Sequence, residues 1–149
     1  MMDRTEKAIK ILESQGIHVM RMTNDNYGGV LLFTDSGYYF VKNDTRPWFH
    51  PPNLNGTGLA VSSSSFDRYI KPNNAHFIYS WGEREEMYIV EGGAFIRDSK
   101  SVIQTDGTDA YVYPLSQSHR FDELVDKKLP LEQKTLDLDD YFEMESDKQ

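Results

Sequence analysis

The 149-residue sequence contains no cysteine. This absence excludes disulfides, thiolate-bound zinc and cysteine nucleophiles, and it is typical of proteins that work in a reducing compartment. Long hydrophobic runs are missing too. No stretch approaches the about 20 apolar residues that cross a bilayer, and the charged N-terminus lacks the apolar segment of a secretion signal. We therefore expect a cytoplasmic protein without a membrane partner.

Motifs of several common enzyme classes are also absent. The sequence has no GxSxG nucleophile turn, no glycine-rich phosphate loop and no dinucleotide-binding fingerprint, so serine hydrolases and nucleotide-binding enzymes gain no support. The histidines show neither HxH nor HExxH spacing, and a metal site made from them would depend on tertiary proximity. They are His18, His50, His76 and His119.

Positive charge is scarce, because 16 Lys and Arg stand against 24 Asp and Glu and give a formal net charge of -8. Broad binding of nucleic acid draws its free energy from Lys and Arg that replace condensed counterions, so this balance disfavours it. Much of the acidity lies in residues 129–149, and the rest of the chain is less acidic than the total. A local nucleic-acid groove is compatible with this composition.

Hydrophobic residues make up 38% of the chain and aromatic residues 13%. At this length such a composition is sufficient for one domain with its own core. We expect that domain over residues 1–128, followed by an acidic C-terminal tail over residues 129–149. Acidic and large apolar residues are mixed in the tail, a composition suited to docking on a protein partner or on the domain itself.

Apolar periodicity, capping residues and turn residues predict a chain in which helices and strands are mixed. We expect helices at residues 3–15, 64–70 and 121–125, and strands at residues 17–22, 29–34, 38–42, 75–81, 87–90, 101–104 and 110–113. A long loop rich in Pro and Gly is expected at residues 43–58. The predicted fold class is α/β (α+β), with a single mixed β-sheet flanked by helices.

The first part of this order resembles a known family. Its expected elements are a helix, a short strand, a hairpin ending in Phe40-Val41-Lys42, a short helix around Phe66 and a further strand. This order is similar to the α-β-β-β-α-β core of PD-(D/E)XK domains, the restriction-endonuclease-like and Holliday-junction-resolvase-like group. The similarity covers residues 3–115, and this chain has a C-terminal hairpin in addition to the core. It implies an endonuclease-like fold, DNA as a partner, and Mg²⁺ as the cofactor of an active member.

The family motif is degenerate in this chain. In the family an Asp on the first hairpin strand and a Glu-x-Lys or Asp-x-Lys on the second carry the chemistry. Lys42 matches the lysine, but Phe40 stands two positions before it. Residues i and i+2 share a strand face, so a phenyl ring takes the place of an oxygen ligand for Mg²⁺.

The resemblance nevertheless implies candidate site residues. The catalytic candidates are Lys42, Asp25 and Asp35. The candidates for metal ligands are Asp25, Asp35 and Asp44. The candidates for substrate binding are Arg46, Trp48 and His50. Each has an ordinary structural alternative, since a strand-end Lys is usually solvated, Asp is favoured in turns, and an aromatic loop can pack on a core.

Three functions are compatible with these observations. The leading hypothesis is a nucleic-acid-associated or regulatory protein of endonuclease-like fold with an impaired metal site, which favours a protein without catalytic activity. The first alternative is an active Mg²⁺-dependent DNA endonuclease. The second is a protein-binding module that acts through the acidic tail. Metal-dependent cleavage separates the first two, and salt-dependent DNA binding counts against the third.

Overall fold

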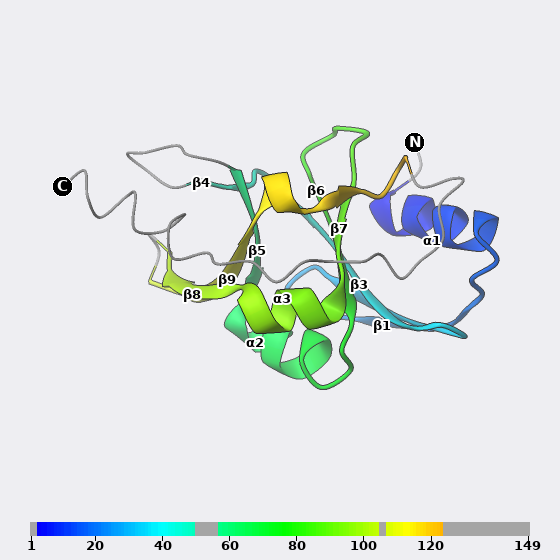
Figure 1. Ribbon diagram of the computed structural model, residues 1–149, viewed down its shortest axis with the longest axis horizontal. Coiled ribbons are helices and arrows are strands. Elements are labelled where there is room, and N and C mark those ends of the chain that lie inside the picture. Colours follow the sequence, from blue (N-terminus) through cyan, green and yellow to red (C-terminus); the bar gives the residue numbers. More distant parts are fainter. Residues whose placement is uncertain (1–2, 50–56, 105–106, 124–149) are drawn as a thin grey trace.

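The computed structural model describes residues 3–49, 57–104 and 107–123, which form two β-sheets with three helices and two short helical turns (Figure 1). The mixed α+β class predicted from the sequence is confirmed. The predictions for His50 and for the acidic tail at residues 129–149 lie outside the described residues. No helix within the described ranges is long and apolar enough to cross a membrane.

Helix α1 (Arg4–Ser14) forms where the sequence predicts a helix. Asp3 is its N-cap, and the Asp3 carboxylate accepts a hydrogen bond of 3.0 Å from the backbone N–H of Glu6. This bond satisfies one of the donors that the start of a helix leaves without a partner. Gly16 follows the helix with a φ of +82°, a left-handed conformation that glycine adopts without steric cost.

The larger sheet has six strands in the order β1-β2-β3-β6-β7-β10. These strands are β1 (Val19–Asn24), β2 (Val30–Thr34), β3 (Gly37–Asp44), β6 (His76–Trp81), β7 (Tyr88–Val90) and β10 (His119–Arg120). Neighbouring strands are antiparallel except β3 and β6, which run parallel. Two parallel neighbours require a crossover connection, so the chain leaves this sheet after β3 and returns to it at β6.

The crossover and the later part of the chain build the second sheet. Its strands follow the order β4-β5-β9-β8 and are β4 (Trp48–Phe49), β5 (Thr57–Ser62), β9 (Asp109–Pro114) and β8 (Lys100–Ile103). After β5 come α2 (Ser63–Ser65) and the π-helical turn η1 (Phe66–Ile70). Helix α3 (Gly92–Asp98) precedes β8, and the 3₁₀ turn η2 (Leu115–Gln117) follows β9.

Buried side chains form two hydrophobic clusters, one on each face of the six-stranded sheet. Alternation along β3 divides its residues between them, since Phe40 belongs to one cluster while Tyr39 and Val41 belong to the other. The Phe40 cluster fills the space between this sheet, the second sheet, η1 and α3, and the Val41 cluster lies under α1. The six-stranded sheet is therefore covered on both faces.

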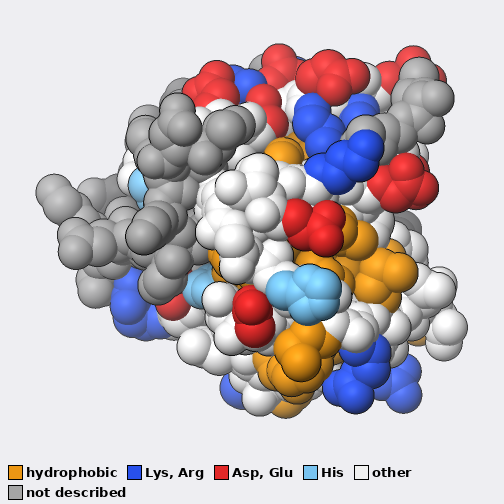
Figure 2. All heavy atoms as spheres, turned by 90° about the vertical axis from the view of Figure 1, so that its right-hand side faces the viewer, with side chains coloured by type: hydrophobic (Ala, Val, Ile, Leu, Met, Phe, Trp, Pro, Cys, Tyr) orange, Lys and Arg blue, Asp and Glu red, His pale blue; other side chains and the backbone are white. Residues whose placement is uncertain are grey.

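The surface around α1 carries both signs of charge. Figure 2 shows this end of the molecule, with acidic side chains gathered along its upper part and Lys and Arg side chains in separate groups. Basic side chains form no continuous band in this view.

Two predicted regions differ from the structure. The expected loop at residues 43–58 contains the end of β3, all of β4 and the start of β5, and α3 was not expected. The helix expected at residues 121–125 is not formed by residues 121–123, which make a bend and a turn, and residues 124–125 lie outside the described ranges. Phe121 is instead fixed by burial and by its backbone N–H, which donates to the carbonyl of Met87 at 2.8 Å.

Candidate functional site

Lys42 lies near the end of β3, on the same face as Phe40 and Asp44. Its ammonium nitrogen is 3.3 Å from a carboxylate oxygen of Asp44, and only 14% of the Lys42 side chain is exposed. The hydroxyl of Tyr79, which is paired with Lys42 across the parallel strands, donates a 2.7 Å hydrogen bond to the other Asp44 oxygen. Lys42 is thus a half-buried, ion-paired group and not a freely solvated strand-end lysine.

Tyr79 is a hydrogen-bond donor to Asp44 in this arrangement. Burial raises the pKa of Tyr79 far above its usual range, and the neighbouring charge of Asp44 raises it further. The phenol is therefore protonated at neutral pH and can donate to Asp44. Asp44 thus has two partners, the ammonium of Lys42 and the neutral phenol of Tyr79.

Lys42 and Asp44 border a cavity of about 250 Å³ between β3 and β5. We call it the Lys42 pocket, and its lining residues are Lys42, Asp44, Thr45, Arg46, Ala60, Val61, Ser62 and Gln104. Three of the sequence-predicted residues, namely Lys42, Asp44 and Arg46, are brought together here. Two cationic side chains and several hydroxyl and amide groups surround one carboxylate, a set that can bind an anionic oxygen.

Phe40 lies two positions before Lys42 on the same face of β3. Its side chain is completely buried, and its ring stacks on Tyr69 with centroids 5.6 Å apart. A Cβ atom added to Gly29 would overlap this ring, with the Cε2 atom of Phe40 only 2.7 Å away. The ring therefore occupies the space that a side chain at position 29, immediately before β2, would need.

Asp25 lies in the turn between β1 and β2 and is 9% exposed. Its carboxylate accepts a short hydrogen bond from the hydroxyl of Ser65, and that hydroxyl accepts a 3.0 Å hydrogen bond from Ser62. Ser62 is a lining residue of the Lys42 pocket. Two serine hydroxyl groups therefore connect the buried carboxylate of Asp25 to this pocket.

Asp35 lies elsewhere, in the turn that joins β2 to β3. Its carboxylate accepts a hydrogen bond of 3.1 Å from the backbone N–H of His18, and its own N–H donates to the carbonyl of His18, also at 3.1 Å. Five residue steps along β3 separate Gly37 from Lys42, a distance of about 17 Å. Asp35 thus fixes a turn at the far end of the strand.

The loop candidates are only partly described. Arg46 lines the Lys42 pocket, whereas Trp48 lies in β4 and pairs with Gly58 of β5. His50 falls outside the described residues. Within residues 3–49, 57–104 and 107–123, no three His, Asp or Glu side chains are close enough together to hold a metal ion.

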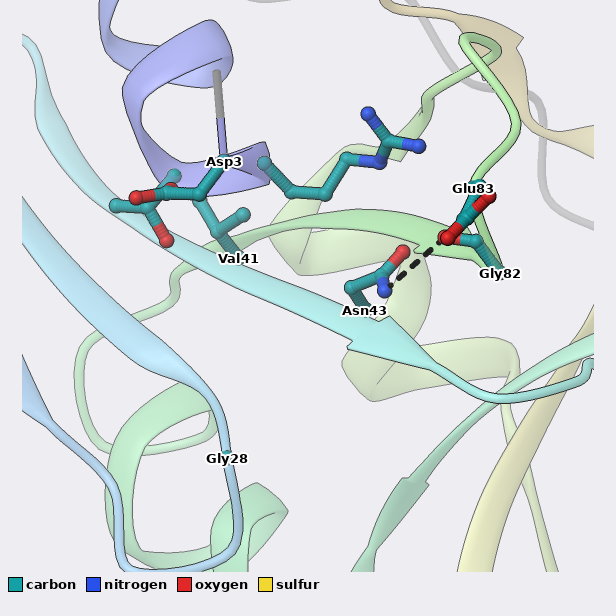
Figure 3. A pocket seen from close by; sticks show the side chains of 8 residues that line it. Asp3, Gly28, Val41, Asn43, Gly82 and Glu83 are labelled. Atoms are coloured by element: carbon teal, nitrogen blue, oxygen red, sulfur yellow. Dashed lines mark hydrogen bonds between the residues drawn. The ribbon is translucent and has the colours of Figure 1, made fainter. Parts of the chain in front are cut away.

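A second cavity of about 320 Å³ lies near the start of α1, and its lining includes Asp3, Val41, Asn43 and Glu83. Figure 3 shows the Asn43 side chain directed at Gly82, to whose carbonyl it donates at 3.4 Å. The Ser80 hydroxyl donates to the Asn43 side-chain oxygen at 2.7 Å. The Asn43 amide is thus used in joining β3 to the turn after β6.

The sequence did not indicate Tyr79, Ser62 or Ser65 as parts of the Lys42 site. Their part in the site can be recognised only in the structure, where β6 pairs with β3 and β5 lines the pocket opposite β3. The run of four serines at residues 62–65 indicated a helix start, which the structure contains, because Ser62 caps α2 by accepting from the Ser65 N–H at 3.2 Å. The same hydroxyl also takes part in the connection to Asp25.

Comparison of this chain with models of protein families, with curated proteins and with solved structures finds no match.

Proposed function

We propose that this protein is a nucleic-acid-associated, regulatory domain of endonuclease-like architecture whose metal site is impaired. The observation that carries the proposal is the replacement of a ligand position by the buried ring of Phe40, two residues before a retained Lys42 in a pocket. A phenyl ring offers no oxygen to Mg²⁺, whereas a lysine in a polar pocket still attracts a phosphate. Binding is expected without the chemistry of cleavage.

The order of elements supports an endonuclease-like architecture. Helix α1 is followed by β1, β2 and β3, then by the short helical segment of α2 and η1, and then by β6. This order contains the α-β-β-β-α-β sequence of the PD-(D/E)XK core, with β4 and β5 added before α2. The hairpin β8–β9 was also expected as an addition.

The chemistry of the Lys42 pocket supports a phosphate ligand. Lys42 and Arg46 supply positive charge, and Ser62 supplies a hydroxyl group. A phosphate oxygen would compete with Asp44 for the Lys42 ammonium, but the Tyr79 hydroxyl remains on Asp44 at 2.7 Å. Since Asp44 keeps a partner, turning Lys42 toward a phosphate leaves no buried carboxylate unsatisfied.

We also propose a cytoplasmic location, because a chain without cysteine does not depend on the oxidising compartments in which disulfides form.

The test is equilibrium binding of fluorescently labelled duplex and branched DNA across a series of salt concentrations. Lys42→Ala should weaken binding at low salt by about tenfold, the loss expected for one charge-assisted hydrogen bond. The slope of log K against log salt should also fall by about 0.9, the value for one lost phosphate contact.

Lys71→Ala is the matched control, because Lys71 is an exposed lysine at the end of η1 and is absent from the pocket lining. This variant should bind like the wild type. Identical isotherms for Lys42→Ala and Lys71→Ala, or no salt-dependent binding by the wild type, would overturn the proposal.

A further inference from the structure

Two aromatic rings stack on each other on the six-stranded sheet, and a guanidinium group lies over each ring. The Arg84 guanidinium lies 4.5 Å from the ring centroid of Trp81, and the Arg120 guanidinium lies 5.7 Å from that of Tyr88. The rings of Trp81 and Tyr88 are 5.7 Å apart and within 10° of parallel. We call these four residues the Trp81 stack.

The Trp81 stack lies on the same face of the sheet as the Lys42 pocket. Directly paired positions in a sheet project their side chains to the same face, and Lys42, Tyr79, Tyr88 and Arg120 are paired in succession across four strands. Trp81 is itself paired with Asp44, at the rim of the pocket. The ring of Trp81 therefore begins one strand spacing, about 4.8 Å, from the strand that carries Lys42.

The Arg84 side chain of the Trp81 stack is partly exposed and loosely held. Arg84 lies in the connection between β6 and β7, its side chain is 48% exposed, and its 3.2 Å ion pair is with the partly exposed Glu86. Exposed ion pairs of this kind are weak and hold a side chain only loosely. The rings of Trp81 and Tyr88 are half-buried and pack against the Phe40 cluster, so they remain in place when Arg84 moves.

We infer that the Trp81 stack is a nucleobase-binding site for single-stranded nucleic acid. A base takes the place of the Arg84 guanidinium on the face of Trp81, and the released Arg84 contacts the phosphate backbone. Aromatic rings beside cations are the features by which proteins bind single strands, because every base has a face that can stack. The inference rests on the proposed function. It adds that the bound nucleic acid is single-stranded and that the Trp81 stack is a second contact region.

Quenching of Trp81 fluorescence by oligothymidylate tests this inference. Trp48 is the only other tryptophan in the sequence, so the titration uses full-length Trp48→Phe protein, in which the signal comes from Trp81 alone. A stacked base should quench this emission in a saturable manner, and Trp81→Leu in otherwise native protein should weaken binding about tenfold, the loss expected for one stacked base.

Reversing the charge of Arg84 tests the site without changing the hydrophobic packing. Arg84→Glu should weaken binding of the single strand more than tenfold, because it introduces repulsion beside the backbone. Arg97→Glu is the matched control, since Arg97 in α3 is 45% exposed and, like Arg84, pairs with a nearby carboxylate.

The outcomes separate this inference from the proposed function. Saturable quenching together with a loss in Arg84→Glu, but not in Arg97→Glu, supports the Trp81 stack as a base site. The absence of quenching, or equal binding by the two charge-reversal variants, overturns it even if Lys42→Ala weakens duplex binding. A loss in Lys42→Ala alone supports only the phosphate contact in the Lys42 pocket.

Discussion

At the scale of single residues, Gly29 and Phe40 form a matched pair. The Phe40 ring packs against Tyr69 and Phe77, and it reaches into the space above the backbone of Gly29. Neither residue can be exchanged for a larger one without displacing the other.

This pairing gives a direct prediction for Gly29→Ala. The added methyl group would overlap the Phe40 ring, so the free energy of unfolding should fall by about 1–3 kcal/mol, the usual cost of overpacking a core. Urea denaturation measures the change. In a Phe40→Leu background the same Gly29→Ala substitution should cost much less. Equal costs in the two backgrounds would show that the overlap is relieved without involving the ring.

At the scale of elements, β6 and α3 are joined through one histidine. The backbone N–H of Gly92, at the start of α3, donates a 2.9 Å hydrogen bond to Nδ1 of His76 in β6. An accepting Nδ1 requires an imidazole without a proton at that position. Burial lowers the pKa of His76, and this effect outweighs the opposite influence of the nearby Glu91 charge. The neutral ring thus anchors the helix to the sheet.

Stability should consequently depend on pH through His76. A lowered pKa means that the unfolded chain binds this proton more readily than the folded protein does, so His76 makes the free energy of unfolding decrease as the pH falls through 6.5. Urea denaturation between pH 8 and pH 5 should show a smaller decrease for His76→Gln, whose amide oxygen can accept from Gly92. His18→Gln removes a histidine from an exposed position as the control. A decrease in His76→Gln as large as in the wild type would contradict this role.

The elements with strong local signals could be predicted from the sequence. Helix α1 has a capping Asp3 and a closing Gly16, and both hairpins contain turn residues between alternating strands. Helix α3 has the opposite local signal, because it begins with Gly92 and Gly93. Only glycine fits at position 92, where a Cβ atom would lie 2.6 Å from the Ala75 carbonyl oxygen, and the Glu91 carboxylate caps the helix. Tertiary packing, which the sequence does not display, determines this helix.

Strand β5 could not be predicted from the sequence for a similar reason. Its Gly58 and the surrounding Pro and Gly residues indicate a loop, yet four of its six residues are buried and it pairs along its length with β9. The same limit applies to the site. Lys42 could be selected from its place on the hairpin, but the contribution of Tyr79 and Ser62 depends on the register of β3 with β6 and on the position of β5. Such long-range pairings leave no local pattern.

At the scale of the whole molecule, the distribution of charge restricts how nucleic acid could bind. Residues 124–149 contain eight acidic and four basic residues, and they account for half of the net charge of -8. Residues 1–123 contain 16 acidic and 12 basic residues and carry the other half of this charge, and the face in Figure 2 shows cations in separate groups. A few well-placed contacts, at the Lys42 pocket and the Trp81 stack, suit this distribution better than a broad electrostatic surface.

The central claim is that Phe40 has removed metal chemistry while Lys42 has kept a nucleic-acid contact. The most direct measurement incubates the full-length protein and its Lys42→Ala variant with labelled linear, nicked and branched DNA in Mg²⁺ or Mn²⁺. Each mixture is analysed on native and denaturing gels. We predict complexes of the wild type with intact DNA, and weaker complexes of Lys42→Ala. Metal-dependent cutting by the wild type that disappears in Lys42→Ala would contradict the account and establish an active endonuclease.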